Sequence, residues 1–280
     1  MLVFNRNHAI KVFVEMYRRF NDHHATALGS EIAYFLLMSI FPFLMFLMTL
    51  LSFANLSSDL VVDYIYRYVP AKWIDLSFME NYLDYLLNER HYVVLFSSLI
   101  FTIWAASKGV NAIFRALDSA YDTVESRSYF RRRGIAYLYT VMLGVCIVAI
   151  IFFPILGEFV FSRLTQLEIE NNFILWIIAR FKWIIFAGIL GLVLASLYYV
   201  APKPKLTFKS ILPGTIFTLA SWAFMSYFYL LYVRFFTRYT TIYGSLGALI
   251  LAMIWFWFLS VAIVLGGELN AVIWALKKKG

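Results

Sequence analysis

The chain of 280 residues has little of three things that many functional classes need: it contains one cysteine, four histidines and 14% charged residues. Cys146 alone can form neither a disulfide within the chain nor a cysteine-based metal site. His23 and His24 follow Asp22, but two histidines and one acid side by side are a weak signal of a metal site. We therefore expect no catalytic residues, no bound metal and no other cofactor.

What the chain has instead is apolar sequence. Hydrophobic residues make up 62% of it, aromatic residues 20%, and the mean hydropathy is +0.77. A helix needs about 20 apolar residues to cross a hydrocarbon core of about 30 Å. Six runs are of this order, and we predict an all-α membrane protein with six transmembrane helices in one polytopic domain, residues 1–280. The six runs are residues 32–53, 92–107, 135–156, 173–200, 211–233 and 246–265.

Basic residues are distributed unevenly between the two sides that these runs define. Of the 24 lysines and arginines, 16 lie on the side that holds both termini and 8 lie on the other. Cytoplasmic loops of membrane proteins carry an excess of lysine and arginine, so both termini are predicted to be cytoplasmic. The net charge of +8 then follows from topology and from attraction to lipid headgroups. The expected partners are membrane lipids with anionic headgroups, and nucleic acid is not expected.

Three segments outside the runs are predicted to be amphipathic. Residues 1–25 should form an interfacial helix on the cytoplasmic side, because apolar side chains recur on one face over residues 9–20. Residues 54–91 should form two short amphipathic helices on the outer side. Residues 108–134 should carry the second helix on into the cytoplasm. There the apolar face comprises Val110, Ile113, Phe114, Leu117 and Tyr121, and the polar face Lys108, Asn111, Arg115, Asp118 and Asp122.

Several short motifs lie in order along nearly the whole chain. They are Ala33–Tyr34–Phe35 with Ser39 and Phe41–Pro42, Ala116–Leu117–Asp118 with Tyr121, Glu125 and Arg127, Pro202 with Leu212–Pro213–Gly214, Tyr243–Gly244–Ser245–Leu246–Gly247, Trp255, and Gly266–Gly267–Glu268–Leu269–Asn270. Together they resemble the YihY/BrkB family of bacterial inner-membrane proteins, formerly labelled ribonuclease BN-like. The sequence departs from the family pattern at Asp118, where the family usually has asparagine, and at Glu31, where it has a small or apolar residue.

The resemblance implies a multi-pass protein in the cytoplasmic (inner) membrane of a bacterium. Proteins of the family have been associated with envelope integrity, with movement of lipids or lipid-A precursors, and with ion exchange. The old ribonuclease label does not fit the residues, because metal-dependent ribonucleases need clustered histidine and aspartate ligands. We therefore predict a protein that is neither an enzyme nor a ribonuclease.

Ionisable and helix-breaking residues near the spans are the candidates for a substrate or ion pathway, since charged groups are costly inside a membrane. Glu31 is either an interfacial carboxylate paired with a base or a functional group. Glu268 follows two glycines that allow close helix contact, and it is expected to pair with Lys108, Arg115 or another base, or to bind substrate or protons. The candidates are Glu31, Tyr34, Ser39, Pro42, Lys108, Arg115, Asp118, Arg127, Tyr243, Gly244, Gly247, Glu268 and Asn270.

Three functions stay open at this stage. The first is transport of lipid or another amphiphile, favoured by amphipathic segments on both faces and by basic groups placed for anionic headgroups. The second is cation/proton exchange, which needs a buried titratable carboxylate. The third is a non-catalytic scaffold or envelope assembly factor. The sequence leaves open a homo-oligomer or an envelope protein as a further partner.

Overall fold

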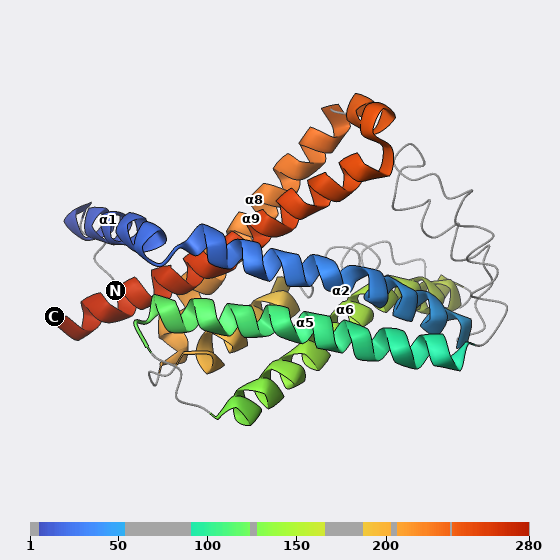
Figure 1. The fold of residues 1–280 in the computed structure, drawn as a ribbon, viewed down its shortest axis with the longest axis horizontal. Coiled ribbons are helices and arrows are strands. Elements are labelled where there is room, and N and C mark those ends of the chain that lie inside the picture. The colour runs from blue at the N-terminus through green and yellow to red at the C-terminus, as the bar shows by residue number, and fades with distance from the viewer. Residues whose placement is uncertain are drawn as a thin grey trace. The chain divides into compact units, whose positions relative to one another are not determined.

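The computed structural model is helical throughout the residues that it describes, with no strand among them (Figure 1). The described residues are 6–53, 91–123, 128–165, 187–202, 206–235 and 237–279. The chain forms two compact units, one of Met1–Phe35 with Ser107–Gly280 and the other of Leu36–Ala106. Each unit is described by itself below.

The smaller unit contains most of α2 (Ala25–Phe53) and the first half of α5 (Tyr92–Ala120). The ring of Phe53 at the end of α2 packs edge-to-face against that of Tyr92 at the start of α5, with centroids 5.0 Å apart. Edge-to-face packing is a favoured geometry for aromatic pairs. The two amphipathic helices predicted over residues 54–91 fall almost wholly outside the described residues.

Pro42 lies inside α2, in the smaller unit. Proline leaves the carbonyl four residues earlier, here that of Met38, without its usual helical donor. In membrane helices a nearby hydroxyl can satisfy such a carbonyl. The buried Ser39 hydroxyl donates instead to the carbonyl of Leu36, at 2.7 Å, a bond within its own turn of helix.

The larger unit consists of the helices that follow α5 together with α1, the start of α2 and the end of α5. It contains α1 (Arg6–Asp22), α6 (Tyr129–Thr165), the helical segment Ala187–Val200, α8 (Phe208–Phe235) and α9 (Thr237–Lys279). α8 and α9 follow each other closely in sequence and lie side by side, and α1 lies against α9 near the C-terminus (Figure 1).

Glycine makes the close approach of α8 to α9 feasible. A methyl group added at Gly214 of α8 would collide with the carbonyl oxygen of Gly266 and with the side chain of Asn270 on α9. Asn270 is fully buried, accepts a hydrogen bond from the Gly214 amide at 2.7 Å and donates one to the Ile211 carbonyl at 3.1 Å. Small residues that let backbones approach, together with polar side chains that bond across helices, are the usual means of helix association in membranes.

A buried tyrosine continues the same interface. The hydroxyl of Tyr198 lies 2.7 Å from the Thr218 hydroxyl and donates to the carbonyl of Ile263 at 2.8 Å, so it links three helical segments. Gly267 on the next face of α9 accommodates the side chain of Leu117 from the end of α5. The predicted apolar face of α5 is indeed buried, with Val110, Ile113, Phe114, Leu117 and Tyr121 all at most 6% exposed.

Four helices are long and apolar enough to cross a membrane: Ala25–Leu50, Tyr92–Ala120, Phe208–Tyr232 and Leu249–Lys278. They coincide with the first, second, fifth and sixth predicted runs. The third predicted run lies within α6, which is not among the four candidates found in the described residues, and Ala187–Val200 is a shorter apolar helix at the end of the fourth. A helical membrane protein is confirmed, whereas the count of six spans and the side of the termini stay predictions.

Candidate functional site

Two helix ends in the larger unit bring ionisable side chains together. α1 ends at Asp22, and His24 has a positive φ of 50°, which turns the chain before α2 begins. Asp122 has a positive φ of 52° just after α5, and the amide of Thr123 donates to the Asp118 carbonyl at 2.9 Å. With the Asp122 amide bonded to the Ser119 carbonyl, this is a Schellman cap. Aspartate and histidine are among the non-glycine residues that tolerate this backbone conformation.

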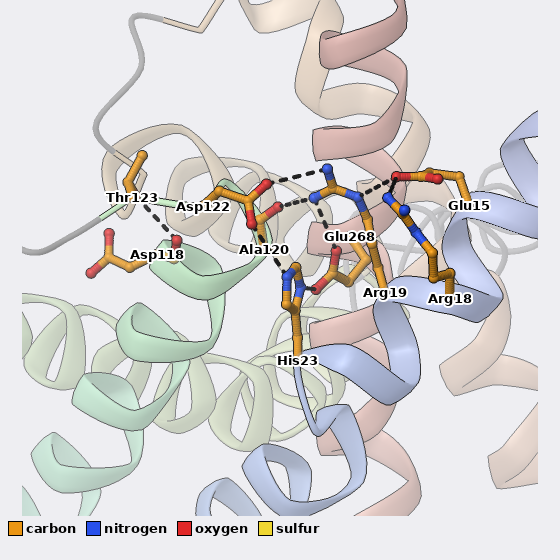
Figure 2. A network of polar contacts seen from close by, with 9 residues as sticks. All are labelled: Glu15, Arg18, Arg19, His23, Asp118, Ala120, Asp122, Thr123 and Glu268. Atoms are coloured by element: carbon orange, nitrogen blue, oxygen red, sulfur yellow. Dashed lines mark hydrogen bonds and ion pairs between the residues drawn. The ribbon is translucent and has the colours of Figure 1, made fainter.

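The ionic cluster that results joins α1, the turn after α5, and α9, as Figure 2 shows. It is defined by six side chains: Glu15, Arg18, Arg19, His23, Asp122 and Glu268. Glu268 is fully buried on α9, while Asp122 is 64% exposed. A buried carboxylate in an apolar helix is costly unless it is paired and hydrogen-bonded. The cluster therefore supplies what Glu268 needs, and it does so mainly from α1.

Arg19 is the centre of the cluster. Its guanidinium donates to the carbonyl of Ala120 at 2.9 Å and to Glu15 at 3.1 Å, and lies 3.2 Å from Asp122 and 4.0 Å from Glu268. The side chain is only 14% exposed. Because guanidinium presents several donors in a fixed fork, one arginine can hold three elements together.

His23 bridges two carboxylates. Its Nδ1 atom lies 2.6 Å from Oε1 of Glu268, and its Nε2 atom lies 3.3 Å from Oδ1 of Asp122. Of the two carboxylates, only Glu268 is closed off from solvent. The described residues donate no hydrogen bond to its second oxygen, Oε2, or to the buried hydroxyl of Tyr121.

The electrostatics outside the spans follow from these contacts. Burial, followed by the negative charge of Glu268, raises the pKa of Tyr121, so this phenol stays neutral. Partial burial opposes ionisation of Glu15, but hydrogen bonds from Arg19 and Arg18 and their charges together hold the pKa of Glu15 below its ordinary value. Cations on α1 thus keep the Glu15 carboxylate charged.

A groove adjoins the cluster between α1 and the C-terminal part of α9. Its volume is about 520 Å³, within the usual range for small-molecule sites. The walls are mixed, with aliphatic side chains from both helices and three cations beside one acid. The lining residues are Ile10, Lys11, Val14, Glu15, Arg18, Arg19, Val272, Ala275 and Leu276.

Glu31 forms an ion pair with a base, as the sequence allowed. That base is Arg115, one of the two that were expected for Glu268. Glu31 of α2 accepts a hydrogen bond from Arg115 of α5, both side chains being about two-fifths exposed. The Lys108 ammonium lies 5.7 Å from the centre of the Phe35 ring. The expectation that Glu268 pairs with Lys108 or Arg115 is therefore wrong.

Helix geometry gives the reason for that correction. Residues two apart point to nearly opposite sides of a helix. Leu117 of α5 faces Gly267 of α9, so Arg115 faces away from α9 and meets Glu31 instead. The cations of Glu268 come from α1, where the sequence predicted only a surface helix.

The other predicted site residues are scattered. Asp118, assigned to a polar face, is only 5% exposed, whereas Tyr34 is 53% exposed. Ser39 and Pro42 belong to the smaller unit, and Asn270 to the α8–α9 interface. Gly247 is buried in α9. Arg127 and the side chain of Tyr243 lie outside the described residues, and Gly244 is known only as part of the α9 backbone.

Sequence reasoning missed Arg19 and His23 as members of the site. Arg19 lies in the segment for which only an interfacial helix was predicted, and His23 was considered only as a metal ligand. The available signal was the position of His23 directly after an amphipathic helix that carries four lysines and arginines but only two acidic residues. Among the described residues, no group of three histidine, cysteine or acidic side chains has the geometry to hold a metal ion.

The chain is similar in sequence to known bacterial proteins and to one family model. The family model described as "Virulence factor BrkB" matches residues 16–279. The ribonuclease-like protein YfkH of Bacillus subtilis is 34% identical over 264 residues, which cover 94% of this chain and 95% of that protein. A UPF0761 membrane protein of Xanthomonas campestris pv. campestris is 22% identical over 94% of this chain, which spans only 60% of that relative. No solved structure matches the chain.

These matches agree with the motifs along the chain and with a fold of long apolar helices. The family model includes both the cluster residue Arg19 and the C-terminal residues around Glu268. The chain belongs to the Virulence factor BrkB family of membrane proteins.

Proposed function

We propose that this protein is a bacterial cytoplasmic-membrane transport protein that moves or handles an anionic lipid or a similar amphiphile. The observation that carries the proposal is the groove between α1 and α9, which joins apolar and basic walls in one space. A lipid has the matching chemistry, since its acyl chains need apolar walls and its phosphate needs cations.

The two kinds of wall are arranged in a way that suits such a ligand. Val272, Ala275 and Leu276 supply the apolar wall of α9, and Lys11 and Arg18 are exposed cations on α1. The described residues give Lys11 no ion-pair partner, so its ammonium is available to an anionic headgroup. Arg18 donates one hydrogen bond to Glu15, at 2.6 Å, and its guanidinium has further N–H groups that can donate to a headgroup.

The surface of α1 supports a position at the membrane boundary. Ile10, Phe13, Val14 and Tyr17 are all more than half exposed. An amphipathic helix with an apolar face and basic flanks lies in the headgroup region of a bilayer. The groove under such a helix opens where headgroups are found. The proposal includes the six-span topology with both termini in the cytoplasm, which puts α1 on the inner leaflet.

The test is lipid redistribution in vesicles that contain the purified protein. A fluorescent phosphatidylglycerol analogue should become accessible to an outer-leaflet quencher faster than in protein-free vesicles. The variant Lys11→Ala/Arg18→Ala should slow this exchange. The control Lys209→Ala removes an exposed cation of α8 outside the groove and should leave the rate unchanged. Exchange no faster than in protein-free vesicles would contradict the proposal.

Cation/proton exchange is the second candidate, favoured by one observation. Glu268 is a fully buried carboxylate of a candidate span, in contact with a titratable histidine. The same vesicles loaded with a pH-sensitive dye test it. A cation-dependent pH change that Glu268→Gln abolishes, without lipid exchange, would replace the first proposal with this one. A scaffold role predicts neither activity.

A further inference from the structure

The groove and the ionic cluster share the same helix and three of the same side chains. Glu15, Arg18 and Arg19 line the groove, and all three belong to the cluster that joins α1 to α9 and to the turn after α5. The position of the wall that α1 contributes to the groove therefore depends on the cluster. A change in the contacts of the cluster is expected to change the groove.

The two contacts of His23 require one proton more than a neutral imidazole between two ionised carboxylates has. A neutral imidazole has one N–H group, so it can donate to one acceptor only. Here Nδ1 faces Glu268 at 2.6 Å and Nε2 faces Asp122 at 3.3 Å. Both contacts are favourable at once only if one additional proton is present, whether it resides on the ring or on the Glu268 oxygen in the short contact.

The charges around His23 lead to the same conclusion. The groups facing it are Glu268 from α9, Asp122 from the turn after α5, and Arg19 from α1, which also carries Glu15 and Arg18. Across the cluster, three carboxylates meet two guanidinium groups. One more proton makes the cluster neutral, which a site containing a fully buried carboxylate requires.

Two nearby titratable groups do not alter this balance. Tyr121 stays a neutral phenol, and Figure 2 shows the carboxylate of Asp118 pointing away from the cluster. The additional proton is therefore the variable that the cluster depends on. Histidine side chains in general change their charge between about pH 5 and 8, so a change of pH across this range is the direct way to test the additional proton.

We propose that the proton bound by His23 between Glu268 and Asp122 latches α1 onto α9 and onto the turn after α5, so that ligand binding in the groove weakens when this proton is lost. On deprotonation, the remaining N–H stays with Glu268, because that carboxylate is buried and cannot turn to water. Asp122 is largely exposed and releases its contact. The effect of the latch on ligand binding rests on the proposed function. The docking of α1 does not, because it is independent of what the groove binds.

Docking is measured directly by electron–electron distance spectroscopy on the full chain in nanodiscs. Spin labels at Tyr17→Cys on α1 and Lys277→Cys on α9, in a Cys146→Ser background, report the separation of the two groove walls. At about pH 6 we expect one narrow distance distribution, and at about pH 8.5 a second, longer one. The ratio of docked to undocked protein should fall about tenfold, as expected for loss of one charge-assisted hydrogen bond.

Variants separate the latch from a general effect of pH. His23→Gln removes the titrating group and should abolish the pH response. If that variant fails to fold, Asp122→Asn replaces it, because a neutral acceptor should reduce the response. His24→Asn, which removes the neighbouring exposed imidazole but tolerates the same backbone conformation, should respond as the unchanged protein does. An unchanged distribution at both pH values, or a full response in His23→Gln, would refute the latch.

Ligand binding is measured separately in the same samples, with a short-chain fluorescent phosphatidylglycerol as the probe. Affinity about tenfold lower at about pH 8.5 than at about pH 6, and pH-independent in His23→Gln, supports the latch acting on the groove. Affinity that stays constant while α1 undocks would overturn the link to the groove. No binding at either pH, with docking still pH-dependent, would refute the proposed function and leave the latch standing.

Discussion

Arg19 offers the sharpest test of how the larger unit is held together. Replacing it with methionine keeps the length and apolar stem of the side chain and removes its charge and donors. Its bond to the Ala120 carbonyl is buried in part, and a bond from a charged donor contributes about 1.5–3 kcal/mol. The pair with Asp122 is exposed and adds about 0–1 kcal/mol.

A further part of the effect comes from Glu268. Removing one partner of a buried ion pair costs about 3–5 kcal/mol, because the remaining charge is left in the interior. Here Arg19 is 4.0 Å away and His23 still contacts Glu268, so only part of this cost applies. We expect Arg19→Met to lower the free energy of unfolding by about 3–5 kcal/mol in total.

The assay is unfolding of purified protein by sodium dodecyl sulfate in mixed micelles. Arg18→Met is the matched control. Arg18 is the preceding residue on α1, is 63% exposed and, among the described residues, forms an ion pair with Glu15 only, so its loss should change stability by about 0.5 kcal/mol or less. In Arg19→Met/Glu268→Gln, the loss should be smaller than the sum of the single losses by about 1 kcal/mol or more. Equal effects of the two arginine variants, or strictly additive effects in the double variant, would refute the reasoning.

Three further outcomes are expected. Leu117→Ala should lower the free energy of unfolding by about 2–5 kcal/mol in the same assay, because the side chain is fully buried against Gly267. The control Leu138→Ala, at a site that is 67% exposed, should lower it by about 0.5 kcal/mol or less. Similar losses in the two variants would contradict the packing of α5 against α9. Asn270→Ala should destabilise by about 1–3 kcal/mol, since it leaves the Gly214 amide buried without its acceptor, and a thermal melting temperature equal to that of the unchanged protein would contradict this role. Single cysteines at Ser58 and at the exposed Lys209, in a Cys146→Ser background, should react with a membrane-impermeant maleimide from opposite sides of intact cells, and labelling of both from outside would overturn the six-span topology.

The sequence predicted the helical class, the membrane setting and the family, and these three predictions were confirmed. They depend on the composition of the whole chain and on patterns within single segments. A run of about 20 apolar residues predicts a membrane helix from its own length and composition. The buried face of α5 could be predicted for the same reason, because the spacing of Ile113, Phe114 and Leu117 fixes which side of the helix is apolar.

The partners of Glu268 could not be predicted in this way. The pairing with Lys108 or Arg115 that we expected was wrong, whereas the pairing of Glu31 with a base is formed. Whether a carboxylate on α9 meets Arg115 or Arg19 depends on the rotation of α5, which the Leu117–Gly267 contact sets, and on two left-handed residues that turn α1 and the end of α5 toward α9. His23 and Glu268 are 245 residues apart in the chain yet 2.6 Å apart in space. Periodicity determines which face of each helix is apolar, but only the packing of one helix against another determines which charges meet.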